Sequence, residues 1–334
     1  MNEKIALITT TINVPEVLAL YRQCDQEVRF FVAGDQKTSK GVAEFVEALG
    51  NARYIAPDEQ HRWNCSEPVG WNCIQRRNIA MLEALEWGAD IIVSVDDDNI
   101  PMDRNYFADI RRLMGGRFSG LSAVGFNYWF DIGQLLQPVA KHRGFSHDVK
   151  ALWSIKPAVD ARVGVCAGLC LGDPDIDAVT RMALAPEVHS MSELARRGLI
   201  VDKTTWTVFN SQNTAIRRQF APYFFMFPGV GRYDDIYASL IVQWAMWAFD
   251  YHVHFGDPAI WQQRNPHNLM KDLRAEIEGM EKVKHIPRLL AGVSSFDGLK
   301  SLEEVFALLA VNGILPKATF QACEAWIRDI EEVL

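Results

Sequence analysis

The sequence predicts an α/β fold, a sheet flanked by helices, and three observations support this prediction. Residues 4–9 and 28–33 are short apolar runs typical of buried strands, and residues 15–24 between them carry apolar residues at helical spacing. Residues 72–87 repeat the helical spacing and lead directly into the apolar run 89–95. Helices that alternate with buried strands are typical of a doubly wound sheet.

The remaining elements follow from the same patterns. Glycine and a carboxylate supply a turn after residue 33, and the Pro-, Asn-, Trp- and Gly-rich residues 51–71 predict an ordered loop over the site. Residues 160–177 are too irregular for a helix. Further elements are a helix over 41–49, strands over 121–129, 163–171 and 205–214, and amphipathic helices over 301–312 and 317–334. We expect one catalytic domain over residues 1–275 and a C-terminal helical extension over residues 276–334.

Composition excludes several classes of protein. The net charge of -8 and the pI near 5.5 argue against a general nucleic-acid binder, which would need a basic face. No N-terminal targeting signal is visible, and the apolar stretch 238–249 is shorter than the ~20 residues of a membrane span. We therefore expect a cytoplasmic protein without an integral membrane segment. The six cysteines show no C-x-x-C spacing, so we expect reduced thiols rather than a zinc ribbon.

Three consecutive aspartates, Asp96, Asp97 and Asp98, follow the apolar run 89–95. A buried strand that ends in a carboxylate cluster is tolerable where a cation offsets the repulsion between the charges. Mg²⁺ and Mn²⁺ are commonly held by one or two carboxylates together with substrate phosphates. The triplet therefore predicts a divalent metal and a nucleotide diphosphate. The alternative is an acidic corner or a capped helix start, with Asp98 or Asn99 as the cap.

Other acidic residues are expected at the same edge of the sheet. Asp35 follows the second predicted strand, and Asp234 and Asp235 open a strongly apolar helix after the Gly-rich segment 229–231. Because ligands of open α/β sheets bind at the carboxyl ends of the strands, we expect these carboxylates to converge. Asp234 or Asp235 would act as a general base or orient a sugar hydroxyl, with Arg232 nearby. Simple capping of the helix is the alternative.

A further acidic cluster, Asp173, Asp175 and Asp177, lies in a Gly- and Pro-containing segment that predicts a turn. Such a turn is a candidate for substrate contacts. Arg77, one helix before the triplet, is a candidate for a phosphate contact, although Arg76 and Arg77 together also fit a solvated basic face.

Histidines and aromatic residues are less informative. His267 is a candidate third metal ligand, although a lone histidine is more often structural. The aromatic run 223–227 fits an acceptor wall, a subunit contact or ordinary core packing, so the sequence leaves a homo-oligomer open.

Four motifs in order resemble one family. They are VSVDDD at 93–98, RNIA at 77–80, GLCLGDPDIDA at 168–178 and GRYDD at 231–235. Over roughly residues 4–275 the chain resembles the reversibly glycosylated polypeptides, the plant UDP-arabinopyranose mutases, and more broadly glycosyltransferases of the GT-A fold. The triplet is similar to a variant of the D-x-D metal signature, and RNIA to the segment whose arginine becomes glycosylated in the plant proteins.

The resemblance implies a GT-A-like, Rossmann-like mixed sheet flanked by helices, which holds a nucleotide sugar through a divalent cation. It implies Asp96 and Asp98, with His267 as a candidate, at the metal. It also implies Asp96, Asp97 and Arg77 at the ribose and phosphates, and Thr9, Thr10, Asn13 and Asp35 at the nucleoside.

Three functions are consistent with these residues. The first is a metal-dependent glycosyltransferase, with Mn²⁺ or Mg²⁺, that transfers the sugar of a nucleotide-diphosphate sugar, most simply a UDP-sugar, to an acceptor hydroxyl. The second is a UDP-sugar pyranose/furanose mutase with the same site, in which the sugar is held on Arg77 or as a captured intermediate. The third is a nucleotide-sugar-binding scaffold without turnover, which binds a partner through the helices after residue 300.

Overall fold

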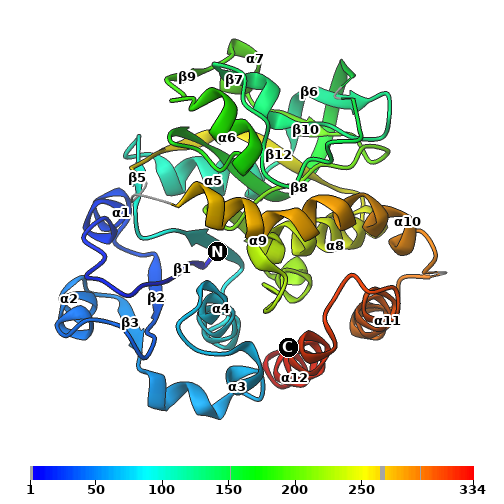
Figure 1. Cartoon of the computed structure of the whole chain (residues 1–334). Coiled ribbons are helices and arrows are strands. Elements are labelled where there is room, and N and C mark those ends of the chain that lie inside the picture. The colour runs from blue at the N-terminus through cyan, green and yellow to red at the C-terminus, as the bar shows by residue number, and fades with distance from the viewer. Residues whose placement is uncertain (1–2, 151, 264–267, 294) are drawn as a thin grey trace.

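The computed structural model describes residues 3–150, 152–263, 268–293 and 295–334. Within them, one ten-stranded mixed sheet in the order β3-β2-β1-β4-β11-β8-β6-β10-β12-β5 forms the centre of the molecule (Figure 1). A separate pair, β7 and β9, forms a small second sheet. The predicted α/β class, a mixed sheet flanked by helices, is confirmed.

The bounds of the strands are as follows. They are β1 Ile5–Thr10, β2 Arg29–Ala33, β3 Ala52–Ile55, β4 Ile91–Val95, β5 Asn99–Pro101, β6 Phe118–Gly125, β7 Leu136–Gln137, β8 Trp153–Gly172, β9 Ser190–Met191, β10 Leu199–Val201, β11 Asn213–Arg217 and β12 Tyr251–Gln262.

Most helices are short. The α-helices are α1 Leu18–Cys24, α2 Val42–Ala48, α3 Ser66–Val69, α4 Arg77–Glu86, α5 Tyr106–Gly115, α6 Ala178–Leu184, α7 Glu193–Arg197, α8 Asp234–Ala248, α9 Leu269–Lys282, α10 Ile286–Leu290, α11 Gly298–Val311 and α12 Lys317–Val333. The 3₁₀-helices are η1 Pro57–Arg62, η2 Ile74–Arg76, η3 Ile132–Leu135, η4 Arg218–Tyr223, η5 Gly231–Tyr233 and η6 Val283–His285.

The N-terminal half of the sheet is parallel. β1 pairs with β2 on one side and with β4 on the other, and β2 pairs with β3, all in parallel. The chain therefore moves outward from β1 to β3 and then returns to the opposite side of β1. The strand order reverses between β1 and β4, and a ligand of an open α/β sheet binds outside such a switch point.

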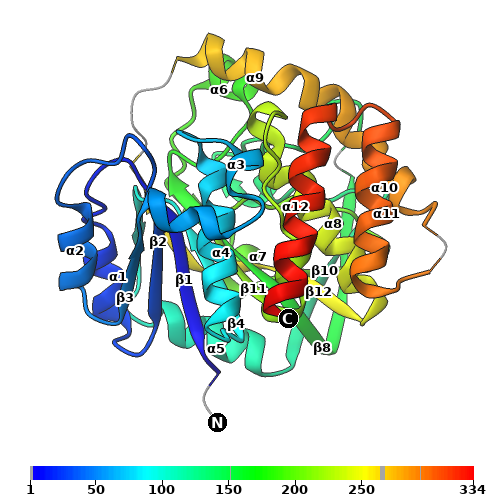
Figure 2. The ribbon, with the colours of Figure 1, turned by 90° about the horizontal axis from the view of Figure 1, so that it is seen from below.

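Both faces of the parallel half are buried, as a doubly wound sheet requires. In β1, Ile5 and Leu7 pack with α1, α2 and α5, while Ala6 and Ile8 pack with α4 and the helices beyond residue 230. Figure 2 shows α1 and α2 on one side of β1 and β2, and α4 and α12 on the other.

The second half of the sheet is mixed. β11 is antiparallel to both β4 and β8, and β8 is long enough to pair with β6 through its first half and with β12 through its second half. Since β10 joins β6 to β12, the four strands β8, β6, β10 and β12 close into a ring. The sequence does not reveal this closure, because every pairing in it joins segments far apart in the chain.

Two predicted elements differ from the structure. Residues 51–71 form β3, η1 and α3 rather than a loop, and β3 extends the parallel sheet. The predicted strand 205–214 is mostly irregular, and β11 begins only at Asn213. The reason is a run of polar side chains at residues 210–212 whose amide and hydroxyl groups bind the site described below instead of facing solvent.

The aromatic run 223–227 is core packing, because each of its side chains is at most 5% exposed. Phe225 packs against Trp326 of α12, with ring centroids 5.1 Å apart, and against Phe306 of α11. The prediction of a subunit contact from these side chains is therefore wrong. An acceptor wall stays a prediction only for Met226, which lines the cavity described below.

The helices after residue 300 share the main hydrophobic core. Asp329 of α12 is fully buried and accepts hydrogen bonds from the backbone N–H groups of residues 64 and 65 and from the side chain of Asn64. The predicted boundary between residues 275 and 276 lies inside α9. No helix among the described residues combines the length and the apolar character that crossing a membrane requires.

Candidate functional site

The loops that follow β1 and β4 meet at the switch point of the sheet. Thr11, directly after β1, donates its hydroxyl to Oδ2 of Asp97 over 2.5 Å. Burial raises the pKa of Asp97, and the neighbouring charge of Asp96 raises it further. The Thr11 hydrogen bond and the charge of Arg77 oppose this increase. Asp97 therefore joins the two loops.

Asp96 is held by two side chains. Nη2 of Arg77 lies 2.6 Å from its Oδ1, and the side-chain amide of Gln212 donates to its Oδ2 over 2.9 Å. Arg77 is only 2% exposed, and its Nη1 donates to the hydroxyl and carbonyl oxygens of Ser211. Arg77 thus offsets part of the repulsion within the triplet. The alternative that Arg76 and Arg77 form a solvated basic face is wrong.

Arg76 has a structural role. It is fully buried and donates to the backbone carbonyl of Ser66 over 2.7 Å and to the side chain of Gln60. It therefore fixes η1 and α3, the segment predicted as a loop.

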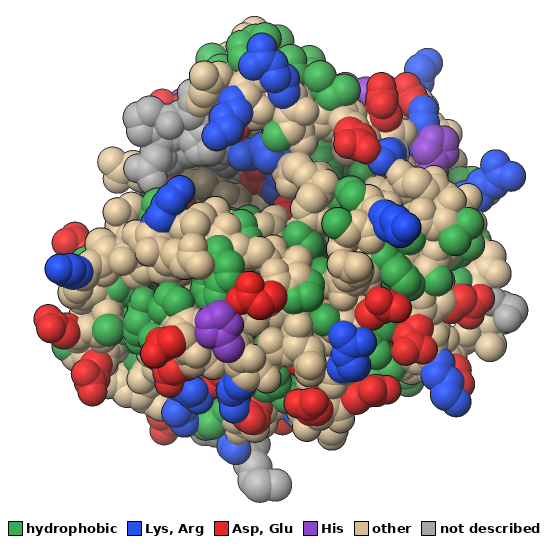
Figure 3. Space-filling model, turned by 60° about the horizontal axis from the view of Figure 1, so that its bottom comes forward, with side chains coloured by type: hydrophobic (Ala, Val, Ile, Leu, Met, Phe, Trp, Pro, Cys, Tyr) green, Lys and Arg blue, Asp and Glu red, His purple; other side chains and the backbone are tan. Residues whose placement is uncertain are grey.

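A cavity of about 250 Å³ opens beside the triplet and brings three of the predicted acidic groups together. Figure 3 shows a hollow on one face of the molecule with basic and acidic side chains in and around it. The polar residues that line the cavity are Asp96, Asp98, Arg143, Asp175, Ser211, Gln212, Arg232, Asp234, Asp235 and Gln262.

Arg143 connects the acidic groups of this cavity. Its Nη2 lies 2.6 Å from Oδ2 of Asp175 and 3.1 Å from Oδ1 of Asp235, and its Nη1 donates to the backbone carbonyl of Arg232. Ser211 adds its backbone N–H and its hydroxyl to Oδ2 of Asp235, at 2.9 and 3.0 Å. One buried cation therefore fixes two carboxylates that come from different parts of the chain.

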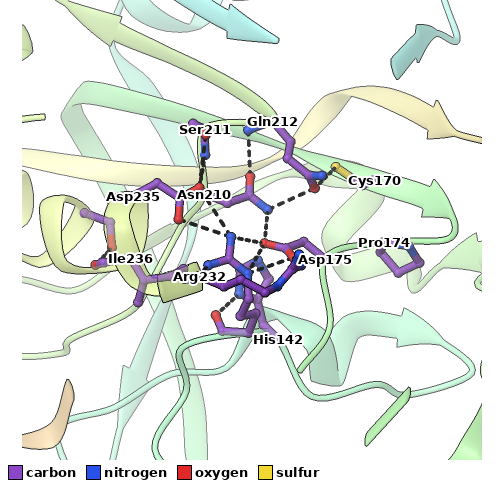
Figure 4. A network of polar contacts seen from close by, with 12 residues as sticks. His142, Cys170, Pro174, Asp175, Asn210, Ser211, Gln212, Arg232, Asp235 and Ile236 are labelled. Carbon is purple, nitrogen blue, oxygen red and sulfur yellow. Dashed lines mark hydrogen bonds and ion pairs between the residues drawn. The ribbon is translucent and has the colours of Figure 1, made fainter. Parts of the chain in front are cut away.

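The same network reaches back to the triplet. Asn210 donates to Asp175 over 3.1 Å and to the side-chain oxygen of Gln212 over 3.3 Å (Figure 4). Gln212 in turn donates to Asp96 over 2.9 Å. Residues 210–212 thus join the strand end at β4 to the helix start at α8.

Two carboxylates open α8, and the charge of Asp234 is less well compensated by bound donors than that of Asp235. It is buried, and the side-chain amide of Gln75 donates to its Oδ2 over 2.7 Å. Burial and the adjacent charge of Asp235 raise the pKa of Asp234 to about 7, against the opposing charge of Arg143. A carboxyl group with a pKa near neutrality is suited to general acid–base chemistry.

Arg232 is bound by acidic groups on several sides. Its Nε lies 3.0 Å from Glu276 of α9, and its terminal nitrogens lie 3.6 Å from Asp175 and 3.7 Å from Asp272. The preceding Gly231 has φ +65°, and a Cβ atom there would lie 2.0 Å from the carbonyl oxygen of Ala275. Glycine is therefore required where η5 crosses α9.

The aspartates of the cluster 173–177 have two different roles. Only Asp175 lines the cavity. Asp177 caps α6 by accepting from the backbone N–H of Thr180 over 2.9 Å, and Asp173 pairs with Arg181. The contacts of Asp173 and Asp177 stabilise the turn that carries Asp175.

The predicted nucleoside residues lie at the carboxyl ends of β1 and β2. Thr9 and Thr10 end β1, and the Thr10 hydroxyl donates to the carbonyl of Ala33. Asn13 is exposed, whereas Asp35 is 3% exposed and accepts from the backbone N–H groups of residues 36, 72 and 73. Asp35 thus holds the start of η2, and its contact with a nucleoside stays a prediction.

The donors near the triplet fit a hard divalent cation. His267 lies outside the described residues, and within them no group of three or more His, Cys, Asp or Glu side chains could hold a metal. Asp96 and Asp98 line the cavity together with Gln262, whose buried Oε1 has no hydrogen-bond partner among the described residues. Two carboxylates and an amide oxygen, completed by water and phosphate, form a ligand set that Mg²⁺ and Mn²⁺ accept.

Sequence reasoning missed Arg143, Gln75, Gln262 and the segment 210–212. A run of five polar residues between apolar segments at 210–214 was a usable signal. No local pattern distinguishes Arg143, which follows His142 in an irregular stretch and acquires its partners only through tertiary packing.

Comparison with known proteins gives structural likeness only. No protein-family model matches the chain, and no curated protein matches its sequence. Among solved structures, a mannosyltransferase from Pyrobaculum calidifontis in complex with GDP-Man and Mn²⁺ is 12% identical, with 99% of this chain and 87% of that chain covered and a TM-score of 0.42.

Two further structures are similar to a comparable degree. TarS 1–349 from S. aureus in complex with UDP-GlcNAc is 12% identical, with 99% of this chain and 80% of that chain covered and a TM-score of 0.46. Glucosyl-3-phosphoglycerate synthase from Mycobacterium tuberculosis in complex with Mn²⁺ and UDP-glucose is 12% identical, with 84% and 78% covered and a TM-score of 0.41.

Proposed function

We propose that the protein is a metal-dependent glycosyltransferase of the GT-A fold that transfers the sugar of a nucleotide-diphosphate sugar, most simply a UDP-sugar, to an acceptor hydroxyl. One observation carries this proposal: Asp96 and Asp98 at the end of β4 line the same cavity as Asp234 and Asp235 at the start of α8. Phosphate-binding and proton-accepting groups therefore face one small space.

The phosphate side of the cavity is the edge near β4. Asp96, Asp98 and Gln262 would hold Mn²⁺ or Mg²⁺, which when bound supplies positive charge to a diphosphate leaving group. Arg77 fixes the orientation of Asp96 through a contact of 2.6 Å, so the carboxylate is pre-positioned before any ligand enters. The Thr9–Asn13 segment and Asp35, at the carboxyl ends of β1 and β2, would contact the nucleoside.

The acceptor side is the start of α8. The acceptor oxygen attacks the anomeric carbon, the bond from that carbon to the diphosphate oxygen breaks, and the electron pair leaves with the nucleotide diphosphate. Asp234 takes the acceptor proton, since its pKa of about 7 leaves a basic carboxylate available near neutral pH. Asp235 and Asp175 are held by Arg143 and would orient sugar hydroxyls.

Incubation with a panel of nucleotide sugars, Mn²⁺ and candidate hydroxyl acceptors tests the proposal. Release of free nucleotide diphosphate that depends on the acceptor supports the transferase, and Asp234→Asn should abolish it while the exposed Asp58→Asn should not. A new sugar isomer without acceptor would support the mutase instead. Binding of the nucleotide sugar without formation of either product would support the non-catalytic scaffold.

The mutase alternative places a sugar on Arg77 or on a captured intermediate. Arg77 is buried, and its terminal nitrogens contact Asp96, Ser94 and Ser211. A glycosyl group on Arg77 would have to displace these contacts, so we favour the transferase.

A further inference from the structure

A second cavity, of about 320 Å³, lies apart from the proposed active site and shares no lining residue with it. It is formed by one side of α5 from Asp109 to Leu113, the start of β6, the end of α7 and the middle of β12. Its volume lies within the range of about 300–1,000 Å³ that is usual for small-molecule sites.

The cavity is basic although the chain as a whole is acidic. Arg112, Arg117, Arg196 and Arg197 line it, against the two carboxylates of Asp109 and Asp257, so its lining carries an excess of two positive charges. The net charge of the chain is -8. A local basic concavity on an acidic protein concentrates anions at that one place.

The arginines are not held by strong partners. Arg112 pairs with Asp109 at 3.0 Å, Arg117 with Asp160 at 3.8 Å and Arg197 with Glu193 at 3.1 Å. All three arginine side chains are more than half exposed, and such surface pairs contribute only about 0–1 kcal/mol. Arg196 makes no ion pair with any described residue. These guanidinium groups therefore remain available for paired hydrogen bonds to an incoming oxyanion.

A buried histidine completes the wall. His254 is 2% exposed, and Sγ of Cys166 lies 3.7 Å from its Nδ1. Burial raises the pKa of the Cys166 thiol to about 12, so the thiol keeps its proton, and it donates to the backbone carbonyl of Asp257 over 3.8 Å. Burial and the charge of Arg112 lower the pKa of His254 to about 3, so the ring is neutral.

The Nε2 group is left accessible by a glycine. Gly198 has φ +77°, and a Cβ atom there would lie 2.5 Å from Nε2 of His254. No described residue forms a hydrogen bond with Nε2, and the ring of His254 lines the cavity. The wall therefore offers a neutral imidazole in addition to the guanidinium groups.

We infer that this cavity is a binding site for a small phosphate-bearing molecule, separate from the nucleotide-sugar site. A phosphate monoester carries close to two negative charges at pH 7, which matches the excess charge of the lining. The cavity is larger than inorganic phosphate alone needs, so the natural ligand carries an organic group.

Titration of the full-length protein with inorganic phosphate in the presence of EDTA, followed by ³¹P NMR, tests this inference. EDTA removes divalent cations, so the proposed active site lacks the metal ion through which it would bind phosphate. We expect saturable binding that Arg196→Ala and Arg112→Ala each weaken at least tenfold. Arg196→Lys should bind with intermediate affinity, because it keeps the charge but loses the planar fork.

Arg288→Ala is the matched control, since Arg288 is also exposed, lies on a five-residue helix and lines neither cavity. It should bind phosphate as the unchanged protein does. Absence of binding, or equal affinity in all variants, would overturn the inference. None of these readouts depends on turnover, so a failure here is distinct from a failure of the proposed transferase.

Discussion

Nη2 of Arg143 lies 3.1 Å from Oδ1 of Asp235, and both side chains are buried. The same nitrogen lies 2.6 Å from Asp175, so one guanidinium compensates two carboxylates at the floor of the cavity. The charge balance of the candidate site therefore depends on Arg143, which the sequence did not single out.

Replacement of this arginine should strongly destabilise the fold. Arg143→Met leaves Asp175 and Asp235 buried without their cation, and removal of one partner of a buried ion pair typically costs about 3–5 kcal/mol. Chemical denaturation at pH 7.5 measures the free energy of unfolding. The exposed Arg288→Met should change it by less than about 0.5 kcal/mol, and a similarly small effect of Arg143→Met would contradict the assigned role.

Stability should depend on the protonation of Asp234. The folded-state pKa of Asp234 is raised from 3.8 to about 7, so the folded protein binds this proton more tightly than the unfolded chain does. The contribution of Asp234 to stability therefore falls as pH rises from about 4 to about 7 and is constant above that range. Asp234→Asn removes this titration.

The stability gain of Asp234→Asn over the unchanged protein should thus grow between pH 4 and pH 7 and then level off. Thermal unfolding of both proteins across this range measures the difference, and the exposed Asp58→Asn serves as the control. A difference that is flat with pH would show that Asp234 does not titrate in this range.

Turnover should depend on the same group. If Asp234 accepts the acceptor proton, kcat/KM rises with pH through about 7 as the carboxyl group ionises. Asp234→Asn should leave UDP affinity unchanged and lower kcat. Asp235→Asn should also leave UDP affinity unchanged and lower kcat to a lesser extent. An equal loss of affinity and turnover would place these residues in substrate binding instead.

Nucleotide binding should require both the cation and Asp98. UDP affinity with Mn²⁺ should fall at least tenfold on addition of EDTA or in Asp98→Asn, while the far-UV spectrum and the melting temperature stay unchanged, because Asp98 lies at the surface of the cavity. Calorimetry with and without Mn²⁺ separates the two effects. Unchanged metal-dependent binding in Asp98→Asn would remove this residue from the metal site.

The C-terminal helix should stabilise the N-terminal half. Asp329→Ala leaves two backbone N–H groups and the Asn64 amide without their acceptor, at about 1–3 kcal/mol for each buried group that stays unsatisfied. Denaturation should show a single transition at lower denaturant concentration. Glu331→Ala, an exposed change on the same helix, should leave the midpoint in place.

Local patterns were sufficient for the parallel half of the sheet. β1, β2, β4 and the helices between them follow from apolar runs and helical spacing, because both signals are short-range. β3 was missed because Pro57, Trp63 and the surrounding polar residues gave the segment the composition of a loop. The ring of β8, β6, β10 and β12 depends on pairings between distant segments, which no local pattern encodes.

For the candidate site, the sequence indicated where carboxylates leave the sheet but not what holds them. Asp96, Asp98, Asp175, Asp234 and Asp235 were predicted and do line one cavity. Arg143, Gln75 and Gln212 were not, since a side chain that binds a carboxylate 32 to 159 positions away leaves no periodic trace. The sequence could not show whether Asp177 caps a helix or contacts substrate, because that depends on the position of its partner Thr180.

The contact between Asp329 and residue 64 spans 265 positions of the chain. The side of α4 that contacts α12 is likewise left uncovered on the ribosome long after β4 has been made, because α12 is synthesised more than two hundred residues later. At about 5–20 residues per second this delay lasts roughly 10–45 s. Chaperones that recognise exposed apolar surface have this interval in which to shield the nascent chain.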